Sequence, residues 1–280
     1  MRNILMAIPV VLVGCVLDGP NKDELTPAEA KTAIESLNQT ARSDNASAAI
    51  VDVTTDVTVG DPLSAIIGGV SDFWESQAPC TAVSVGGDTL TLDFGSLADD
   101  CTFAGHTYAG IDTVAFTAVD PGTMKVMHTF DAFTNGNVTI DGTTDVTWTG
   151  DDDWTRHVES DYVFANFVDP TLVEVHSEHT VSRLDPAVPI RDGGFVLSGT
   201  RDWTVDDHND WSMTMNDLKL MIDDAAPFAG TAEVVTPDDR NLSIVYDRLD
   251  DGTITATVTG EGGNKSLVFY IDQDGVVNDQ

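Results

Sequence analysis

From Cys80 onward, hydrophobic and polar residues alternate along most of the chain, and turn-forming residues interrupt the alternation at regular intervals. The segment NVTIDGTTDVTWT shows the pattern clearly, because threonines and aspartates alternate there with the apolar residues Val138, Ile140, Val146 and Trp148. Successive side chains of a strand point to opposite faces, so the pattern predicts strands with one buried face and one solvated face. We expect about a dozen strands in an all-β fold, a large antiparallel meander that forms an open twisted sheet, a sandwich or a barrel-like sheet.

The residues before these strands have a helical pattern instead. The segment LTPAEAKTAIESLNQTA has Thr26 at the N-cap, Pro27 in the first turn and Glu29 three residues after the cap. This spacing is the signature of a capping box at the start of a helix. Apolar residues repeat at helical spacing after it, and again over 61–74. The sequence therefore predicts one or two short N-terminal helices and no helix after them.

One strand pair recurs farther along the chain. Residues 136–163 align without a gap with residues 193–220, and seven of the first nineteen aligned positions are identical. The match suggests a duplicated sheet unit, in which the two aligned tryptophans have equivalent core positions. Convergence of two strands on Thr, Asp and Gly is the alternative. Because no linker divides the chain, we expect a tether and helix over 15–45 and a single antiparallel β domain over 46–280.

The chain begins with MRNILMAIPVVLVGC, in which a short apolar run follows Arg2. A membrane-spanning helix needs about 20 apolar residues, so this shorter run is typical of a signal peptide. Its last four residues, LVGC, resemble the lipobox of bacterial lipoproteins. That resemblance implies removal of residues 1–14 and attachment of a lipid to Cys15, which anchors the chain to a membrane. An ordinary secretory signal with an incidental cysteine is the alternative.

Acidic residues greatly outnumber basic ones. The sequence contains 47 Asp and Glu residues against 13 Lys and Arg residues, and its formal net charge is −34. A polyanion is repelled by nucleic acid and by anionic lipid surfaces, so we expect no nucleic-acid partner. The charge favours solubility, and it also permits divalent cations or a basic partner.

Two cysteines remain once Cys15 is assigned to the lipid. Cys80 and Cys101 would then lie in a compartment that permits disulfides, and they flank an expected hairpin that turns at Gly86-Gly87-Asp88. We expect a disulfide between them. A metal-binding thiol pair is less favoured, because the CxxC spacing is absent.

A longer pattern covers residues 80–148, in the order CTAVSV, TLTLDFG, CTFAGHTYAG and FDAFTNGNVTIDGTTDVTW. It resembles a pattern in uncharacterised bacterial lipoproteins that have a lipobox signal peptide and a β-rich domain with the order Cys, Asp-Phe-Gly, Cys. Members commonly carry basic residues in the Gly-x-x-Tyr-x-Gly stretch, where this chain has His106 and Ala109. The resemblance supports the disulfide and the β fold, and it implies no activity.

The segment EVHSEH is a candidate metal or acid–base site. Strand alternation places Glu174, His176 and Glu178 on one face and His179 on the other. A row along one strand is too long for a single metal ion without help from a neighbouring strand. A solvated strand face is therefore the favoured interpretation. Three arginines, Arg183, Arg191 and Arg201, are too scattered in the sequence to predict a site.

Two acidic loops occupy equivalent places in the expected repeat, GDDDW and DDHNDW. Clustered carboxylates can bind Ca²⁺ through several oxygens, so the candidate ligands are Asp151, Asp152, Asp207 and Asp210. Polar hairpin turns that precede core tryptophans are the favoured alternative. No other cofactor is expected.

The sequence contains no motif for nucleophilic catalysis, neither a G-x-S-x-G elbow nor an H-E-x-x-H pair nor a phosphate-binding loop. We therefore expect a non-enzymatic lipoprotein of the bacterial cell envelope, anchored to the outer membrane, that acts as a scaffold or binding module for a protein, a glycan or an apolar ligand. One alternative is a carrier whose sheet encloses a cavity lined by Trp148, Trp203 and Phe195. A glycan-active enzyme with paired carboxylates is the other.

Overall fold

A computed structural model describes most of the chain after the expected signal peptide and tether. The described residues are 24–150, 154–166, 171–206, 209–222, 224–261 and 265–279. Cys15 lies outside them, as do Asp151, Asp152 and Asp207. The predictions made for those four residues therefore stay predictions.

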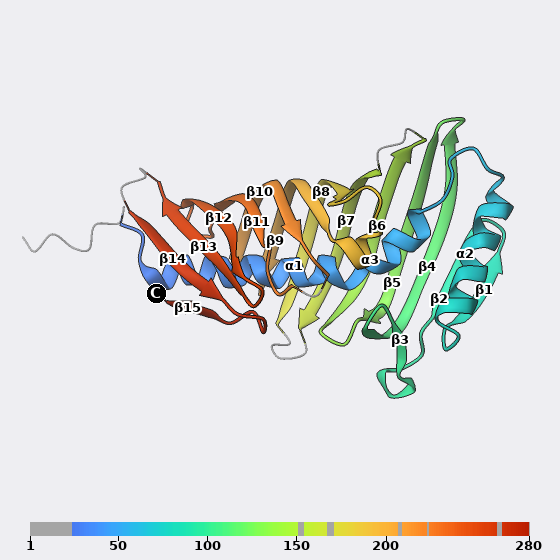
Figure 1. The fold of residues 1–280 in the computed structure, drawn as a ribbon, viewed down its shortest axis with the longest axis horizontal. Coiled ribbons are helices and arrows are strands. Elements are labelled where there is room, and N and C mark those ends of the chain that lie inside the picture. Colours follow the sequence, from blue (N-terminus) through green and yellow to red (C-terminus); the bar gives the residue numbers. More distant parts are fainter. Residues whose placement is uncertain are drawn as a thin grey trace, which may run out of the picture.

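The strands form one antiparallel sheet in which nearly every strand pairs with its sequence neighbours (Figure 1). The described residues make fifteen strands in the order β1-β2-β4 through to β15, with β3 beside β4 and off this path. The two ends of the order, β1 and β15, do not pair with each other, so the sheet is open. The prediction of a large antiparallel meander is confirmed. The strands are β1 (Ala82–Gly86), β2 (Thr89–Asp93), β3 (Cys101–Phe103), β4 (His106–Asp120), β5 (Thr123–Thr134), β6 (Val138–Thr149), β7 (Thr155–Asn166), β8 (Leu172–Arg183), β9 (Phe195–Val205), β10 (Asn209–Leu220), β11 (Ala229–Val235), β12 (Asn241–Asp250), β13 (Thr253–Gly260), β14 (Ser266–Ile271) and β15 (Val277–Asp279).

A long helix, α1 (Pro27–Thr55), runs across the strands on one face of the sheet (Figure 1). The predicted capping box is present: the backbone N–H of Thr26 donates to the Glu29 carboxylate at 2.9 Å, and the N–H of Glu29 donates to the Thr26 hydroxyl at 3.3 Å. Small residues on the helix are fully buried, among them Ala33 and Ala49. They let the helix backbone approach the sheet closely.

The predicted boundary between a helical tether and a β domain at residue 46 differs from the structure. Residues 46–55 continue α1, a second helix α2 (Leu63–Gln77) follows, and the sheet begins only at Ala82. Tertiary packing explains the longer helix, because Ala46, Ile50 and neighbouring residues are buried in the core and most helical stability comes from such burial. The second helix agrees with the expected range 61–74. The prediction of no helix after these two is wrong at two short places, Leu97–Asp99 and α3 (Ile190–Gly193).

The two faces of the sheet differ as the alternation predicted. In β6, Val138, Ile140, Val146 and Trp148 are all buried, and the residues between them are mainly exposed or half-buried. The inner face packs against α1, and the outer face carries Thr, Ser, Asp, Glu and His side chains. The predicted disulfide between Cys80 and Cys101 is also confirmed, with the two Cα atoms 5.4 Å apart.

Irregularities of register interrupt the pairing of several strands, among them β4, β5, β10 and β12. The register shifts between Phe130 and Phe133 in β5 and between Met215 and Leu218 in β10. A bulge bends its strand and increases the local twist.

The two matched glycines of the expected repeat share one backbone conformation. Gly142 has a φ of 139° and Gly199 a φ of 149°, and a Cβ would clash with a carbonyl oxygen of a neighbouring strand, β7 for Gly142 and β8 for Gly199. Only glycine fits such a position without strain. The close neighbour is the following strand in the first copy and the preceding strand in the second, so the duplicated sheet unit stays a prediction.

Candidate functional site

Buried ion pairs attach α1 to the sheet. Asp44 and Asp52 are eight residues apart, about two helical turns, and so face the same side of α1. One nitrogen of Arg201 in β9 donates to both carboxylate oxygens of Asp44, at 2.6 and 2.7 Å. Asp52 accepts from Arg183 at 3.0 Å and from Arg191 at 2.9 Å. The three arginines that are scattered in the sequence therefore meet two carboxylates of one helix.

The Asp44–Arg201 pair is almost completely enclosed, since the Arg201 side chain is 1% exposed and that of Asp44 is 11% exposed. Burial raises the pKa of Asp44, and the charge of Arg201 opposes this rise. Burial also lowers the pKa of Arg201, but Asp44 outweighs it and the net pKa of Arg201 is raised. Each charge opposes the loss of charge that burial favours in the other group, and the contact fixes α1 against β9.

A second buried cluster has the arrangement of a hydrolase triad. The Thr54 hydroxyl lies 3.0 Å from His128 Nε2, and His128 Nδ1 lies 2.8 Å from an oxygen of Asp112. The same order of hydroxyl, imidazole and carboxylate activates a nucleophile in serine hydrolases. Here the side chains of His128 and Asp112 are 0% exposed, so a substrate has no access to them. We assign the cluster a structural role in joining α1 to β4 and β5.

The outer face carries the residues of EVHSEH as the alternation predicted. Glu174, His176 and Glu178 are exposed, and His179 is buried on the inner face. His176 Nδ1 lies 2.7 Å from a carboxylate oxygen of Asp161 in β7. The hydrogen bond to Asp161 raises the pKa of His176 above its usual value. His176 is therefore engaged with a carboxylate of the neighbouring strand β7.

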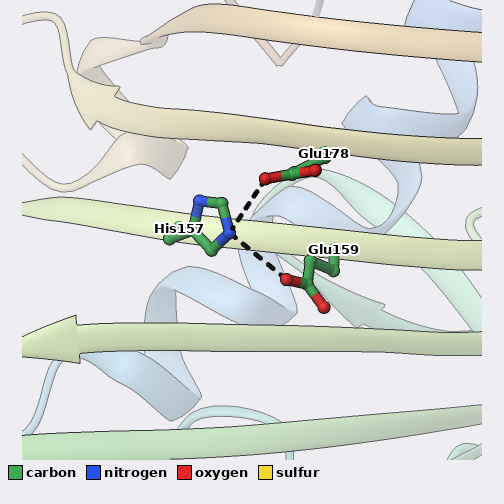
Figure 2. A group of neighbouring side chains, drawn as sticks. All are labelled: His157, Glu159 and Glu178. Carbon is green, nitrogen blue, oxygen red and sulfur yellow. Dashed lines mark hydrogen bonds and ion pairs between the residues drawn. The ribbon is translucent and has the colours of Figure 1, made fainter.

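A neighbouring strand does bring further ligands to Glu178. His157 and Glu159 of β7 lie beside Glu178 of β8, and Figure 2 shows the imidazole between the two carboxylates. His157 Nε2 is 3.4 Å from Glu159 and 3.8 Å from Glu178. Two atoms bound to one tetrahedral ion at about 2.1 Å lie about 3.4 Å apart, so the spacing suits a small divalent cation. The same spacing also suits a protonated imidazole between two carboxylates, and the outer sides of all three residues are open to solvent.

The predicted calcium ligands are only partly within the described residues. Asp210, at the start of β10, accepts a hydrogen bond from the Thr204 hydroxyl at 2.8 Å. Asp151, Asp152 and Asp207 lie outside this part of the chain. Calcium binding by the acidic loops stays a prediction.

We expect the buried His179 to make the protein less stable in acid. Burial lowers the pKa of His179 from 6.5 to about 3, and the nearby charge of Arg201 acts in the same direction. Below about pH 6.5 the unfolded chain binds a proton at this imidazole and the folded chain does not, so stability falls as the pH falls. The expected loss from this group is about 2 kcal/mol between pH 7 and about pH 5. Urea unfolding at both pH values measures it.

His179→Leu is the control for this prediction, because leucine cannot take up the proton. Between pH 7 and about pH 5, the free energy of unfolding of the variant should fall by about 2 kcal/mol less than that of the wild type. This difference does not depend on how stable the variant is at neutral pH. An equal pH dependence in both proteins would show that His179 does not carry the acid sensitivity.

A cleft of about 920 Å³ lies between the N-terminal half of α1 and the ends of β9 to β12. Asn38 of α1 and Trp211 of β10 line it, together with residues of the turn between β11 and β12. Trp211 stacks on Trp203 with ring centroids 5.7 Å apart and planes 7° from parallel. The Trp203 indole N–H donates to the Ser36 hydroxyl at 2.8 Å, so α1 fixes the position of the stack.

The cleft differs from the cavity that a carrier of apolar ligands would need. Trp148, Trp203 and Phe195 are buried in the packed core of the inner face, where α1 covers the sheet. Sequence reasoning did not find the cleft, because its walls come from one helix and from strand ends far away in the chain. Apart from Glu29 of the capping box, the sequence pattern singles out only one residue of the cleft lining, Trp211, the tryptophan of the second repeat copy.

Neither a protein-family model nor a curated protein nor a solved structure matches this chain. Among the described residues, no helix is both long enough and apolar enough to cross a membrane.

Proposed function

We propose that the chain is a lipid-anchored, extracytoplasmic lipoprotein of the bacterial cell envelope that acts as a non-enzymatic binding module. The cleft beside α1 carries the binding part of the proposal, because it is open to solvent and its volume is typical of ligand sites. The lipobox resemblance supports the anchor. The Cys80–Cys101 disulfide supports an oxidising compartment outside the cytoplasm.

Two features favour binding over catalysis. The hydroxyl–imidazole–carboxylate cluster is sealed in the core, where no substrate reaches it. In the cleft, hydrogen bonds from Thr26 lower the pKa of Glu29, which makes this carboxyl a poor general acid for glycoside hydrolysis. The packed inner face likewise leaves the apolar-ligand carrier without support.

The anchor is tested by replacing Cys15 in bacteria that process lipoproteins. Wild-type protein should take up a fatty-acid label and sediment with membranes, because lipid chains attached to Cys15 hold it there. Cys15→Ser should lose the label and either remain an uncleaved precursor or become soluble. Metabolic labelling and membrane fractionation measure both effects.

Cys80→Ser is the matched control, since it removes another cysteine and leaves the lipobox intact. Any copies of this variant that accumulate should keep the label. Wild-type protein that carries no lipid, or a Cys15→Ser protein that still carries one, would refute the proposed anchor.

A further inference from the structure

The outer face of the sheet brings one imidazole and two carboxylates together. Glu159 of β7 lies directly opposite Glu178 of β8, and His157 lies two residues before Glu159 on the same face of its strand. One ligand atom of each side chain lies within 4.8 Å of those of the other two. The pairing of β7 with β8 is regular from Thr155 to Ala165, so the sheet fixes the points from which the three side chains project.

A single nitrogen of the imidazole faces both carboxylates. His157 Nε2 is 3.4 Å from an oxygen of Glu159 and 3.8 Å from an oxygen of Glu178, and both dashed lines in Figure 2 end on that nitrogen. Nε2 carries at most one hydrogen, so a hydrogen bond from it serves one carboxylate and leaves the other. A metal ion between the three side chains binds all three ligand atoms at once. Convergence on one nitrogen therefore favours a shared ion over a shared proton.

The balance of charge on this face points the same way. The neighbouring acid–base pairs have one carboxylate for each base, since Asp145 lies 2.9 Å from Lys125 and Asp161 lies 2.7 Å from His176. The cluster, in contrast, has two carboxylates for one imidazole. Like charges directly opposite each other on neighbouring strands are destabilising. A divalent cation would neutralise both.

The ligand atoms select the class of ion. An imidazole nitrogen combined with carboxylate oxygens suits a divalent transition-metal ion such as Zn²⁺, whereas Ca²⁺ and Mg²⁺ prefer larger shells made of oxygen alone. The side chains of His157, Glu159 and Glu178 are 43%, 57% and 63% exposed, so water can complete the shell. Three protein ligands plus water is the arrangement of zinc sites that keep an open position.

We propose that His157, Glu159 and Glu178 form a surface site for a divalent transition-metal ion such as Zn²⁺. The ion binds His157 Nε2 and one oxygen of each glutamate. The site faces away from α1, which lines the cleft. The inference therefore goes beyond the proposed binding function and does not depend on it.

The test is calorimetric titration of the full-length, detergent-solubilised protein with ZnCl₂, after treatment with EDTA and removal of the EDTA. We expect saturable binding with one ion per chain in the tightest class of sites. His157→Gln and Glu178→Gln should each weaken it at least about tenfold, because even the outer-shell partners of metal ligands commonly contribute that much to affinity. Saturating Zn²⁺ should also raise the melting temperature of the wild type more than that of His157→Gln, since an ion bound to the folded state stabilises it by mass action.

His176→Gln is the matched control. It removes another imidazole from the outer face of the same two strands, where His176 is hydrogen-bonded to one carboxylate, that of Asp161. The variant should keep the Zn²⁺ affinity of the wild type. If it loses as much affinity as His157→Gln does, the ion lies elsewhere and the inference is wrong.

Two further results would overturn the inference. One is the absence of saturable Zn²⁺ binding, or an equal affinity in the wild type and in His157→Gln. The other is displacement of Zn²⁺ by an equal concentration of Ca²⁺ or Mg²⁺, which would mean that a chain of net charge −34 attracts any divalent cation. The replaced side chains are exposed, so urea unfolding should show that every variant folds with nearly the stability of the wild type.

Discussion

Asp44→Ala is expected to lower the free energy of unfolding by about 3 to 5 kcal/mol, since it leaves the buried guanidinium of Arg201 without its partner. The carboxylate accepts two short contacts from one nitrogen of Arg201, and the Arg201 side chain is almost wholly enclosed. Water cannot reach the enclosed guanidinium, so hydration does not compensate for the lost attraction to Asp44. Urea unfolding at low salt measures the change and avoids the screening that guanidinium chloride would add.

Two controls separate the loss of the pair from the loss of a helix side chain. The double variant Asp44→Leu, Arg201→Met should recover most of the stability, because it removes both charges and keeps apolar volume. Lys31→Ala removes one partner of the exposed pair Lys31–Glu35 on the same helix, and it should cost less than about 1 kcal/mol. If Asp44→Ala costs no more than Lys31→Ala, the Asp44–Arg201 pair is solvated in solution.

Trp211→Ala should lower the free energy of unfolding by about 3 to 5 kcal/mol, the usual range for truncation of a core tryptophan. Trp211 is 8% exposed, and its ring lies parallel to that of Trp203. Thermal and urea unfolding of the purified variant measure the loss. The alanine variant should also expose Trp203, which a red shift of its fluorescence would report.

Trp154→Ala is the matched comparison, because the expected repeat aligns Trp154 with Trp211. The repeat predicts equal losses, but the structure places Trp154 half-buried between Arg156 and Arg183, with guanidinium carbons 4.3 and 4.5 Å from the ring centroid. We expect a smaller loss of about 1 to 2 kcal/mol from these cation–π contacts. Equal losses in the two variants would instead support the same core role for both tryptophans.

Local patterns account for most of the fold. Alternation identified β6 and its buried face, and the spacing of Thr26 and Glu29 identified the start of α1. The disulfide was predicted because two cysteines, Cys80 and Cys101, remain when Cys15 is assigned to the lipid. Each of these features depends on residues close in sequence or on simple counting, so the chain itself carries the signal.

Local patterns in the sequence could not predict where α1 ends or which distant residues meet at the sites. Residues 42–55 are rich in Ser, Asn, Asp and Thr, which are poor helix formers, and they are helical because the sheet encloses them. Asp44 and Arg201 are 157 residues apart, so no local spacing connects them. Asn38 resembles an ordinary solvent-facing residue in the sequence, and only the folded chain shows that it is 3% exposed.

The course of the chain also has a consequence for how the protein forms. Helix α1 crosses the sheet from the side of β15 toward the side of β1, and the meander then returns in the opposite direction (Figure 1). Each new strand can pair with the strand made just before it, so the sheet grows by local steps, which favours rapid folding. The growing sheet presents an unpaired strand edge at every stage, and in the finished open sheet that edge is the short β15. The yield of folded protein therefore depends on adding the next strand faster than a second molecule pairs with that edge.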